Sequence, residues 1–473
     1  MWERSRISDL LPGISPESHS FTYTYPPPYV AWDRSSCGGF DIAETDAWQD
    51  FSMYVHFPFC RMNCNFCSLH RQTAHNESMV SGYLQSLRRE LRLLGESRCV
   101  PPLQALYLGG GTPTMLSADE LNELLDCIAA AAQIPSGADV EVTIECAPEA
   151  GRDAQGWYTL FRSLTSRRVL PVTRVSVGVE AWSDVVLARM GRTAATVSAV
   201  RALLGAIDES VATYNIDFLV GYPRGPEGPR EEARDIVAAV RSLRDQKLRV
   251  PSVSIYQLWA VENIPISRAS LHTLPPADDL LIELWTVQSA LYDFGYMPGY
   301  GTAFVRGAED LHRWTRHRYE AFRHLGFGSG SYSFLPDGLV QRERDLAGYR
   351  ALLAQQSLDW GEVDRVLNLV TRLSAVDREM RRIICGLRSG TPVLPPPTTA
   401  SDRELQELGS KLSRLEALEV LERRGEGLTL SADSLLLTNA VSSYLHPVTM
   451  PRKPPVARHA ALVSRQRGAR RSG

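Results

Sequence analysis

Three cysteines stand close together in the segment MYVHFPFCRMNCNFCS, residues 53–68. Cys60, Cys64 and Cys67 form a C-x3-C-x2-C pattern. Thiolates are the usual ligands of iron–sulfur clusters, and a [4Fe–4S] cluster normally takes four of them. Three thiolates on one loop would therefore leave one iron open for an exchangeable ligand. Aromatic neighbours in the same segment would shield this centre from water. We interpret the three cysteines as the ligands of one [4Fe–4S] cluster.

Two plainer interpretations of the cysteines fit the pattern less well. Zinc usually takes four ligands in two separated pairs, whereas here three cysteines stand in one run. Unrelated core cysteines rarely fall so close together in sequence. The remaining five cysteines are scattered, which does not indicate a disulfide framework.

Length and composition indicate a globular protein with more than one domain. The chain has 473 residues, of which 44% are hydrophobic and 22% are charged. Its net charge of -3 gives no reason to expect nucleic acid or a membrane as a partner. No apolar run is long enough to cross a bilayer, and the first residues lack the apolar stretch of a signal peptide. We expect a cytoplasmic protein, because such a cluster needs a reducing compartment.

Strand-like and helical patterns alternate from Met53 onward. The first helix is expected to stop at Gly95, and Ser117 with Glu120 predicts a capping box at the start of a later helix. Six strands are expected, each followed by helical sequence. Their ranges are 53–57, 103–108, 140–145, 174–179, 214–220 and 252–258. This alternation predicts an α/β fold whose parallel sheet curls into a partial (β/α)6 barrel.

The residues best suited to chemistry stand near the carboxyl ends of these strands, where such sheets carry their active sites. The cysteines follow the first strand, and Gly109–Gly111 follow the second. Glu145 ends the third strand, Glu180 follows the fourth, and Asp217 lies within the fifth. We therefore expect these side chains to share one site.

The chain is expected to fall into four segments. Residues 1–50 form an N-terminal strap, whose aromatic and proline-rich run at 21–32 either packs on the core or walls a substrate cavity. Residues 51–300 form the barrel. In residues 301–446, helices followed by a two-strand wing and a last helix predict a smaller, winged-helix-like α+β domain. The basic residues 447–473 contain no acid and predict a disordered tail.

Seven motifs occur in a fixed order along the chain. They are YVHFPFC, GGGTPT, TIECAPE, RVSVGVEAWSDVVLARMGR, NIDFLVGYP, VSIYQL and LGFGSGSYSF. Together they resemble the radical S-adenosylmethionine (SAM) superfamily, and within it the coproporphyrinogen oxidase-like (HemN-like) family, from about Tyr54 to Tyr444. The resemblance implies an enzyme that cleaves SAM reductively at its cluster. It also implies a small-molecule substrate and an electron donor such as flavodoxin or ferredoxin.

The same resemblance implies a SAM site beside the cluster. Tyr54 would line it, and Gly109, Gly110 and Gly111 would let backbone approach the methionyl amine, since no Cβ intervenes. Glu145 would bind ribose hydroxyls or the amine. A tight turn for the glycines and a salt bridge for Glu145 are the plainer alternatives.

Some members of the family hold a second SAM in the same barrel. The positions that match its contacts are Phe66, Gly111, Thr112, Glu180, Arg192, Asp217 and Gln257. Arg192 would clamp a carboxylate, and the acids would hold an amine or a ribose. Glu180 stands where the family usually has glutamine, so the contact at that position is an open question.

Three kinds of family member compete as the closest functional match. Oxygen-independent coproporphyrinogen oxidases usually have a further cysteine two residues after the last ligand, whereas here Cys67 is followed by Ser68 and Leu69. Haem chaperones usually show a His-Asn-x-Tyr-Trp-like patch, whereas residues 317–321 read HRYEA. These departures favour the third kind, a class C radical SAM methyltransferase. It would alkylate an sp2 carbon of a natural product or tetrapyrrole with a second SAM.

Overall fold

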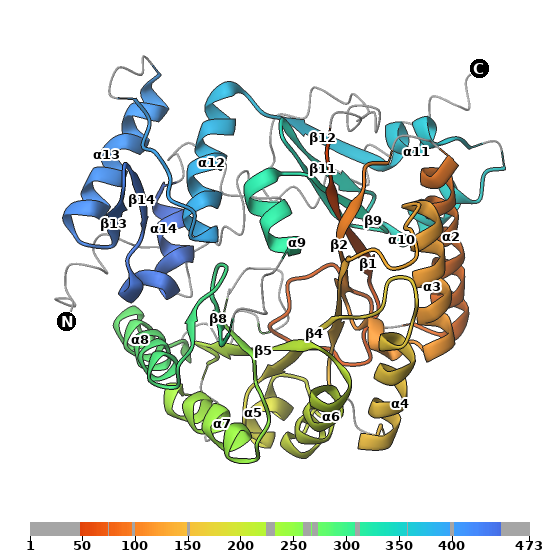
Figure 1. Ribbon diagram of the computed structural model, residues 1–473, viewed down its shortest axis with the longest axis horizontal. Coiled ribbons are helices and arrows are strands. Elements are labelled where there is room, and N and C mark those ends of the chain that lie inside the picture. Colours follow the sequence, from red (N-terminus) through yellow and green to blue (C-terminus); the bar gives the residue numbers. More distant parts are fainter. Residues whose placement is uncertain are drawn as a thin grey trace.

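The computed structural model describes residues 48–73, 75–96, 100–148, 152–223, 232–258, 266, 273–307, 313–356, 358–397 and 402–445. The aromatic run at 21–32 and the basic tail therefore lie outside the described residues. Figure 1 shows helices along the outside of a strongly curved sheet. Among the described residues, no helix combines the length and the apolar character needed to span a bilayer.

Six parallel strands form the expected partial barrel, and each is followed by at least one helix. The strands are β1 (Phe51–Phe57), β2 (Leu103–Gly110), β3 (Glu141–Cys146), β4 (Arg174–Glu180), β5 (Thr213–Val220) and β6 (Ser252–Gln257). The helices after them are α2 (Glu77–Glu96), α3 (Ala118–Ala131), α4 (Ala154–Thr165), α5 (Asp184–Arg189) with α6 (Val197–Ser210), α7 (Ala233–Asp245) and α8 (Ala277–Asp293). A short 3-10 turn, η3 (Pro113–Met115), separates β2 from α3.

The local signals behave mostly as expected. Ser117 and Glu120 form the capping box of α3, with each side chain bonded to the other residue's backbone N–H. The expected stop at Gly95 is wrong, because α2 continues to Glu96. A Cβ at Gly95 would lie 3.1 Å from the Cα of Ala131, so glycine here allows close packing of α2 on α3 and does not end the helix.

The sheet extends beyond the barrel strands at both edges. Within the described residues its order is β12-β11-β10-β9-β1-β2-β3-β4-β5-β6-β8-β7. The added strands are β7 (Met297–Pro298), β8 (Ala303–Val305), β9 (His324–Phe327), β10 (Tyr332–Leu335), β11 (Gly338–Arg342) and β12 (Asn368–Arg372). Strand β9 runs parallel to β1, whereas β10, β11 and β12 form an antiparallel meander.

The main core lies between the barrel helices and the sheet, and Trp157 and Phe161 of α4 are among its fully buried side chains. Each such side chain contributes about 1.5–3 kcal/mol by burial. One carboxylate, Glu90 of α2, is fully buried in this region. It pairs with Arg342 at 2.9 Å and accepts hydrogen bonds from the Tyr349 hydroxyl and the Gly328 N–H. Since an unpaired buried charge is costly, this network ties α2 firmly to the strand extension.

A second core belongs to the last part of the chain. It is built by α12 (Ala375–Ser389), α13 (Arg403–Ala417), the hairpin β13 (Leu421–Arg424) and β14 (Gly427–Leu430), and α14 (Thr438–Leu445). A 3-10 turn, η6 (Ala432–Leu437), leads into α14. The expected wing and final helix are therefore present. Because β9 to β12 belong to the barrel's own sheet, the expected domain boundary at residue 300 stays a prediction, and the separate core begins only at α12.

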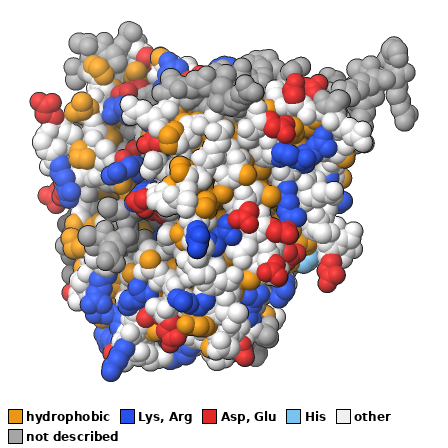
Figure 2. Space-filling view, turned by 45° about the vertical axis from the view of Figure 1, so that its right-hand side comes forward, with side chains coloured by type: hydrophobic (Ala, Val, Ile, Leu, Met, Phe, Trp, Pro, Cys, Tyr) orange, Lys and Arg blue, Asp and Glu red, His pale blue; other side chains and the backbone are white. Residues whose placement is uncertain are grey.

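Four short elements remain. They are α9 (Arg313–Arg316), the π-helical turn η5 (His317–Ala321), α10 (Leu346–Leu353) and α11 (Trp360–Leu367). Of these, α10 and α11 pack in the main core. Arg381 of α12 is buried, and its guanidinium donates to the carbonyls of Leu335 and Gly338. The surface seen in Figure 2 mixes acidic, basic and apolar side chains, with Lys and Arg frequent in its lower part.

Candidate active site

The loop that carries the three cysteines leaves the carboxyl end of β1 and closes on itself. Cys60 N–H donates to the Gln72 carbonyl at 3.2 Å, and Gln72 N–H donates to the Pro58 carbonyl at 2.5 Å. The ring of His56 joins the two sides of this loop, because its Nε2 lies 2.8 Å from the His70 carbonyl and its Nδ1 lies 2.9 Å from the Tyr54 hydroxyl. Burial lowers the pKa of His56 to about 4, so the ring is neutral. It is a fully hydrogen-bonded structural histidine, as expected from its place inside a strand.

Asn65, between the second and third cysteines, fixes this loop to a distant part of the barrel. Its Nδ2 donates to the Arg189 carbonyl at 2.7 Å and lies 3.0 Å from the Tyr222 hydroxyl, while its N–H donates to the Met190 carbonyl at 2.9 Å. The turn after α5 can approach so closely because Gly191 has no Cβ, which would lie 2.4 Å from the Asn63 carbonyl oxygen. Sequence reasoning missed this anchor, since nothing local links Asn65 to Tyr222.

Two hydrogen-bond donors reach the thiols, one from the turn after β2 and one from the turn after α5. The Thr112 hydroxyl lies 3.6 Å from Cys60 Sγ, and Arg192 Nη1 lies 3.5 Å from Cys64 Sγ. Arg71 Nη2 also donates to the Cys64 carbonyl at 2.5 Å. Two residues expected at a SAM site therefore contact the cysteines directly.

The three thiols fit a shared inorganic centre. Burial raises the pKa of Cys60 to about 12, and the neighbouring Cys67 and Cys64 add to the rise. Burial likewise raises the pKa of Cys67, against the opposing effect of Arg71. Positive iron would remove the repulsion that makes these thiolates unfavourable together. In the described part of the chain, no three His, Cys, Asp or Glu side chains converge as they would on a single metal ion. A four-iron cluster is larger than an ion and spaces its ligands further apart.

Each glycine of the run at the end of β2 lies so close to a different neighbour that a Cβ would clash. A Cβ on Gly109 would lie 2.6 Å from the Glu145 carboxyl carbon, and one on Gly110 would lie 2.2 Å from the His56 ring. A Cβ on Gly111 would lie 2.4 Å from the Phe59 carbonyl oxygen. Gly110 also has a φ of 102°, which favours glycine. Here the run lets β2 pack against the cysteine loop and Glu145, and the expected contact with a methionyl amine stays a prediction.

Glu145 lies next to this glycine run at the end of β3. It accepts hydrogen bonds from the Tyr107 hydroxyl at 2.9 Å and from the Gly110 N–H at 2.7 Å. Burial raises the pKa of Glu145 to about 7, although both hydrogen bonds favour the ionised form. Tyr54 is close to the same carboxylate: burial and then Glu145 raise the pKa of its hydroxyl. These contacts place Tyr54 and Glu145 together on the glycine side of the barrel.

Two further acids come from the neighbouring strands. Burial raises the pKa of Glu180 to about 7 and that of Asp217 to about 6, and Asp217 adds to the shifts of both Glu145 and Glu180. Asp217 accepts hydrogen bonds from Ser176 at 3.1 Å and Asn215 at 2.6 Å. Glu180 has a φ of 69°, an uncommon backbone conformation for a residue with a side chain. Three coupled carboxyls therefore stand on β3, β4 and β5.

Arg192 connects one of these acids, Glu180, to the cysteines. Its side chain is buried, its Nη2 donates to the Gly178 carbonyl, and its charge favours the ionised form of Glu180. Its Nε has no hydrogen-bond partner among the described residues. A buried guanidinium with a free N–H suits an anionic group of a ligand, and the expected carboxylate clamp stays a prediction.

The two other expected ligand contacts lie nearer to β6. Phe66 is half-buried against a small apolar cluster that includes Met190 and Leu258. Gln257 is the last residue of β6 and lies opposite Val220 of β5. The expected residues therefore reach from the glycine side of the barrel round to β6.

An aromatic group that sequence reasoning missed packs beside Tyr54. The rings of Tyr107 and Trp314 lie 4.4 Å apart between centroids, and Tyr54 is 6.3 Å from Trp314. The Arg318 guanidinium lies over Trp314 at 5.1 Å and over Phe334 at 4.9 Å. This group could not be predicted from the sequence, because β2 and α9 are far apart along the chain. It adds an apolar wall to the glycine side of the site.

Comparisons with known proteins agree with this arrangement. Residues 54–253 match the model of the radical SAM superfamily. The heme chaperone HemW of Escherichia coli (strain K12) is 27% identical over 293 residues, which cover 62% of this chain and 72% of the relative. The oxygen-independent coproporphyrinogen III oxidase of Bradyrhizobium diazoefficiens is 23% identical over 434 residues, which cover 85% of this chain and 88% of the relative.

A solved structure shares the fold. Coproporphyrinogen III oxidase (HemN) from Escherichia coli superposes with a TM-score of 0.67 and 19% identity, covering 88% of this chain and 99% of the other. The parallel barrel with a cysteine loop at its carboxyl edge defines a radical SAM protein. Sequence similarity over residues 54–253 and the shared fold relate this protein to the radical SAM superfamily and, within it, to HemN-like proteins. The radical SAM match implies a [4Fe–4S] cluster and SAM as cofactors.

Proposed function

We propose that this radical SAM enzyme alkylates or methylates an sp2 carbon of a natural product or tetrapyrrole, and that a second SAM supplies the carbon. The observation that carries the proposal is the residue two positions after the last cysteine. Leu69 stands there with 53% of its surface exposed, where the family's oxidases usually have another cysteine. Residues 317–321 likewise lack the Asn and Trp usual in haem chaperones.

Cys60, Cys64 and Cys67 would hold the [4Fe–4S] cluster. When bound, the cluster and SAM supply a 5′-deoxyadenosyl radical by reductive cleavage, using an electron from a donor such as flavodoxin or ferredoxin. Thr112 and Arg192 would stabilise the thiolates by hydrogen bonds, and the wall formed by Tyr54, Tyr107 and Trp314 would exclude water.

The buried acids support a site with more than one cationic ligand. Glu145, Glu180 and Asp217 stand on three successive strands, and neighbouring strands are about 4.8 Å apart. The outer two are therefore on the order of 10 Å apart across the sheet, further than one ammonium group reaches. SAM carries both an ammonium and a sulfonium. Two SAM molecules would offer positive groups along this whole row of carboxylates, and Arg192 would bind a carboxylate of one of them.

The test is anaerobic turnover with dithionite and SAM deuterated at its methyl group. We expect deuterium in 5′-deoxyadenosine together with S-adenosylhomocysteine, since the methyl group of the second SAM would lose a hydrogen. An Arg192→Ala variant should transfer less label than an Arg403→Ala control, whose change lies on the exposed side of α13. Consumption of SAM without label transfer would contradict the proposal.

A second candidate is retained because of the long match to an oxidase, which spans 85% of this chain. In that case the protein would oxidise a propionate side chain of a porphyrinogen, or handle haem as HemW is named to do. Incubation with coproporphyrinogen III under the same conditions separates the two candidates. Release of carbon dioxide without S-adenosylhomocysteine would favour the oxidase, and tight haem binding without SAM turnover would favour the chaperone.

A further inference from the structure

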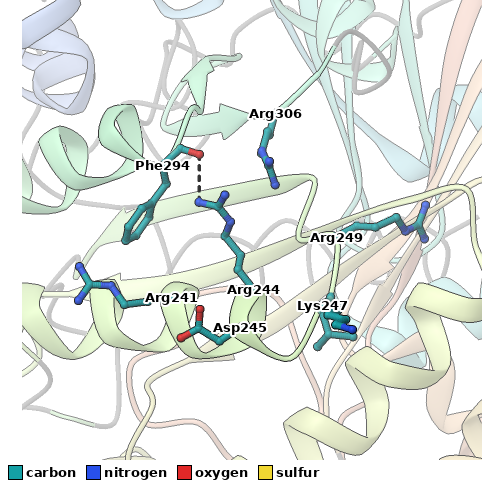
Figure 3. A pocket seen from close by; sticks show the side chains of 8 residues that line it. Arg241, Arg244, Asp245, Lys247, Arg249, Phe294 and Arg306 are labelled. Atoms are coloured by element: carbon teal, nitrogen blue, oxygen red, sulfur yellow. Dashed lines mark hydrogen bonds between the residues drawn. The ribbon is translucent and has the colours of Figure 1, made fainter.

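A basic pocket lies at the edge of the sheet opposite to the cysteine loop. It has a volume of about 650 Å³ and is lined by Arg241, Arg244, Asp245, Lys247, Leu248, Arg249, Phe294 and Arg306 (Figure 3). Arg249 precedes the amino end of β6, and Arg306 directly follows β8, whose Val305 lies opposite Ser252. The cysteines follow the carboxyl end of β1. Because β6 has six residues, roughly 20 Å of strand separates the two edges of the sheet.

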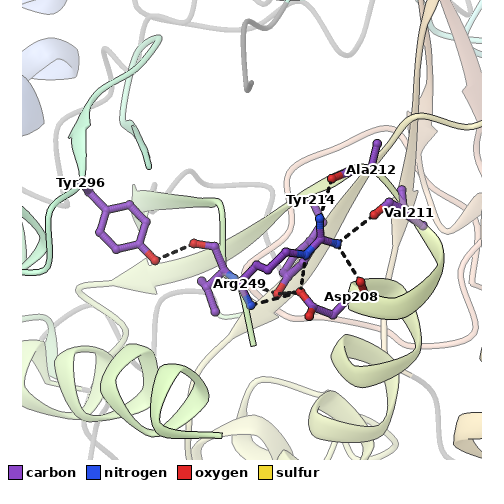
Figure 4. Close-up of polar contacts among 7 residues, drawn as sticks. Asp208, Val211, Ala212, Tyr214, Arg249 and Tyr296 are labelled. Carbon is purple, nitrogen blue, oxygen red and sulfur yellow. Dashed lines mark hydrogen bonds and ion pairs between the residues drawn. The ribbon is translucent and has the colours of Figure 1, made fainter. Parts of the chain in front are cut away.

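One of the pocket's cations has a structural role. The Arg249 guanidinium pairs with Asp208 at 3.0 Å and donates to the carbonyls of Ala212 at 2.8 Å and Val211 at 2.9 Å (Figure 4). Its positive charge is thus neutralised within the protein. The Tyr214 hydroxyl also donates to the Asp208 carboxylate at 3.0 Å. These contacts hold the turn between α7 and β6 in place.

The other four cations lack such compensation. Of the residues that line the pocket, Arg241, Arg244, Lys247 and Arg306 face one acid, Asp245. Among the described residues, none of these five side chains forms an ion pair. The whole chain has a net charge of -3, so this local excess of positive charge runs against the overall composition. A charge excess of this kind attracts anions.

Two of the guanidinium groups point into the same part of the pocket. In Figure 3, Arg306 and Arg244 come from opposite sides and point towards one another. Burial raises the pKa of Tyr296 to about 12, and both guanidinium groups oppose this rise. Both charges are therefore near the Tyr296 hydroxyl, which donates to the Val250 carbonyl at 2.6 Å. Arg244 is further fixed by a hydrogen bond of 3.0 Å to the Phe294 carbonyl. Two like charges brought together repel each other, and an anion between them would remove that repulsion.

The pocket's chemistry also limits the ligand. The centroid of the Phe294 ring lies 5.6 Å from the Arg241 guanidinium and 5.4 Å from the Arg244 guanidinium. This aromatic side chain is therefore flanked by cationic groups. Leu248 is the other apolar residue of the lining. Guanidinium groups bind phosphate through two parallel hydrogen bonds, and lysine binds it as a point charge. The volume suits a small molecule.

We propose that this basic pocket binds a phosphorylated small molecule through Arg244, Arg306, Arg241 and Lys247, at a site separate from the cluster and SAM. The ligand class is an organic di- or triphosphate, because four cations against one carboxylate leave about three positive charges to be balanced. The proposal does not depend on which reaction the enzyme catalyses.

The test is calorimetric titration of the anaerobically reconstituted protein with inorganic pyrophosphate and tripolyphosphate at constant ionic strength. We expect saturable binding of one anion per chain. The Arg306→Gln variant should bind at least ten times more weakly, and Arg244→Gln with Arg306→Gln should abolish binding. The matched control carries Arg234→Gln and Arg403→Gln, two exposed arginines outside the pocket, and changes the net charge equally.

Three results would overturn the proposal. The first is absence of saturable binding to the unmodified protein. The second is an equal loss of affinity in the control, which would indicate only a general effect of net charge. The third is tighter binding of a single-stranded RNA that pyrophosphate does not displace, since this would make the pocket part of a nucleic-acid surface. Arg306 has an exposed side chain, so its variant tests the pocket even if the Arg244 variant fails to fold.

Discussion

Arg192 Nη1 lies 3.5 Å from Cys64 Sγ, although 128 residues separate them in the chain. The same guanidinium donates to the Gly178 carbonyl at the end of β4 and acts on Glu180. One buried side chain thus links the cysteine loop to Glu180, the last residue of β4. Any ligand that engages Arg192 is therefore held close to the thiols.

The first prediction concerns the three cysteines. Replacing Cys60, Cys64 or Cys67 with alanine should abolish the brown chromophore after anaerobic reconstitution, because the two remaining thiolates are too few to bind the cluster. Cys127, half-buried on α3, provides the matched control and should keep full iron and sulfide content. Iron and sulfide assays on the folded variants give the answer. A triple alanine variant that still binds the cluster would show that these residues are not its ligands.

The second prediction concerns the contact between Arg192 and Cys64. Hydrogen bonds to sulfur and nearby positive charge raise the reduction potential of iron–sulfur clusters. Arg192→Ala should therefore make the potential more negative. A hydrogen bond to a charged group contributes about 1.5–3 kcal/mol, which for one electron corresponds to at most on the order of 60–130 mV. Arg192→Lys should show a smaller shift in a redox titration followed by electron paramagnetic resonance. Equal potentials in all three proteins would mean that the contact does not act on the cluster.

The third prediction concerns Asn65. Asn65→Ala removes the hydrogen bonds to the Arg189 carbonyl and the Tyr222 hydroxyl, and should lower the free energy of unfolding by about 1–3 kcal/mol. It should also reduce cluster retention, because the loop loses its anchor to the turn after α5. Asn63→Ala, at an exposed position with one bond to Arg71, should cost less than about 1 kcal/mol. Urea unfolding of the cluster-free proteins measures this difference, and equal costs would argue against an anchoring role.

The fourth prediction concerns pH and Glu180. Burial raises the pKa of Glu180 to about 7 from 4.5, so between these values the folded protein holds a proton that the unfolded chain has lost. The group therefore destabilises the fold increasingly as pH rises through this window, and fully above about pH 7. Glu180→Gln should be close to neutral near pH 4.5 and stabilising by about 3 kcal/mol at pH 8. Urea unfolding at both pH values tests this. A difference in stability between the two proteins that does not change with pH would mean that the Glu180 carboxyl is solvated.

Periodicity predicted the six barrel strands, and the spacing of Ser117 and Glu120 predicted the capping box of α3. The cysteine spacing predicted the loop, because its chemistry is local. Strands β9 to β12 were harder to recognise: they are only four or five residues long, and a glycine or serine stands in β9, β10 and β11. The apolar wall around Trp314 and the anchor at Asn65 depend on contacts between distant residues, which no local pattern reveals.

The same anchors determine the order in which the holoenzyme is assembled. The cysteine loop is held by Asn65 against the turn after α5, by His56 within β1 and by the glycines of β2, so its shape depends on a barrel that has already formed. An unfolded nascent chain carries the three thiols without these contacts. We therefore predict that cluster delivery is a late maturation event, in which a donor of iron and sulfide meets a folded apo-protein and not an unfolded polypeptide.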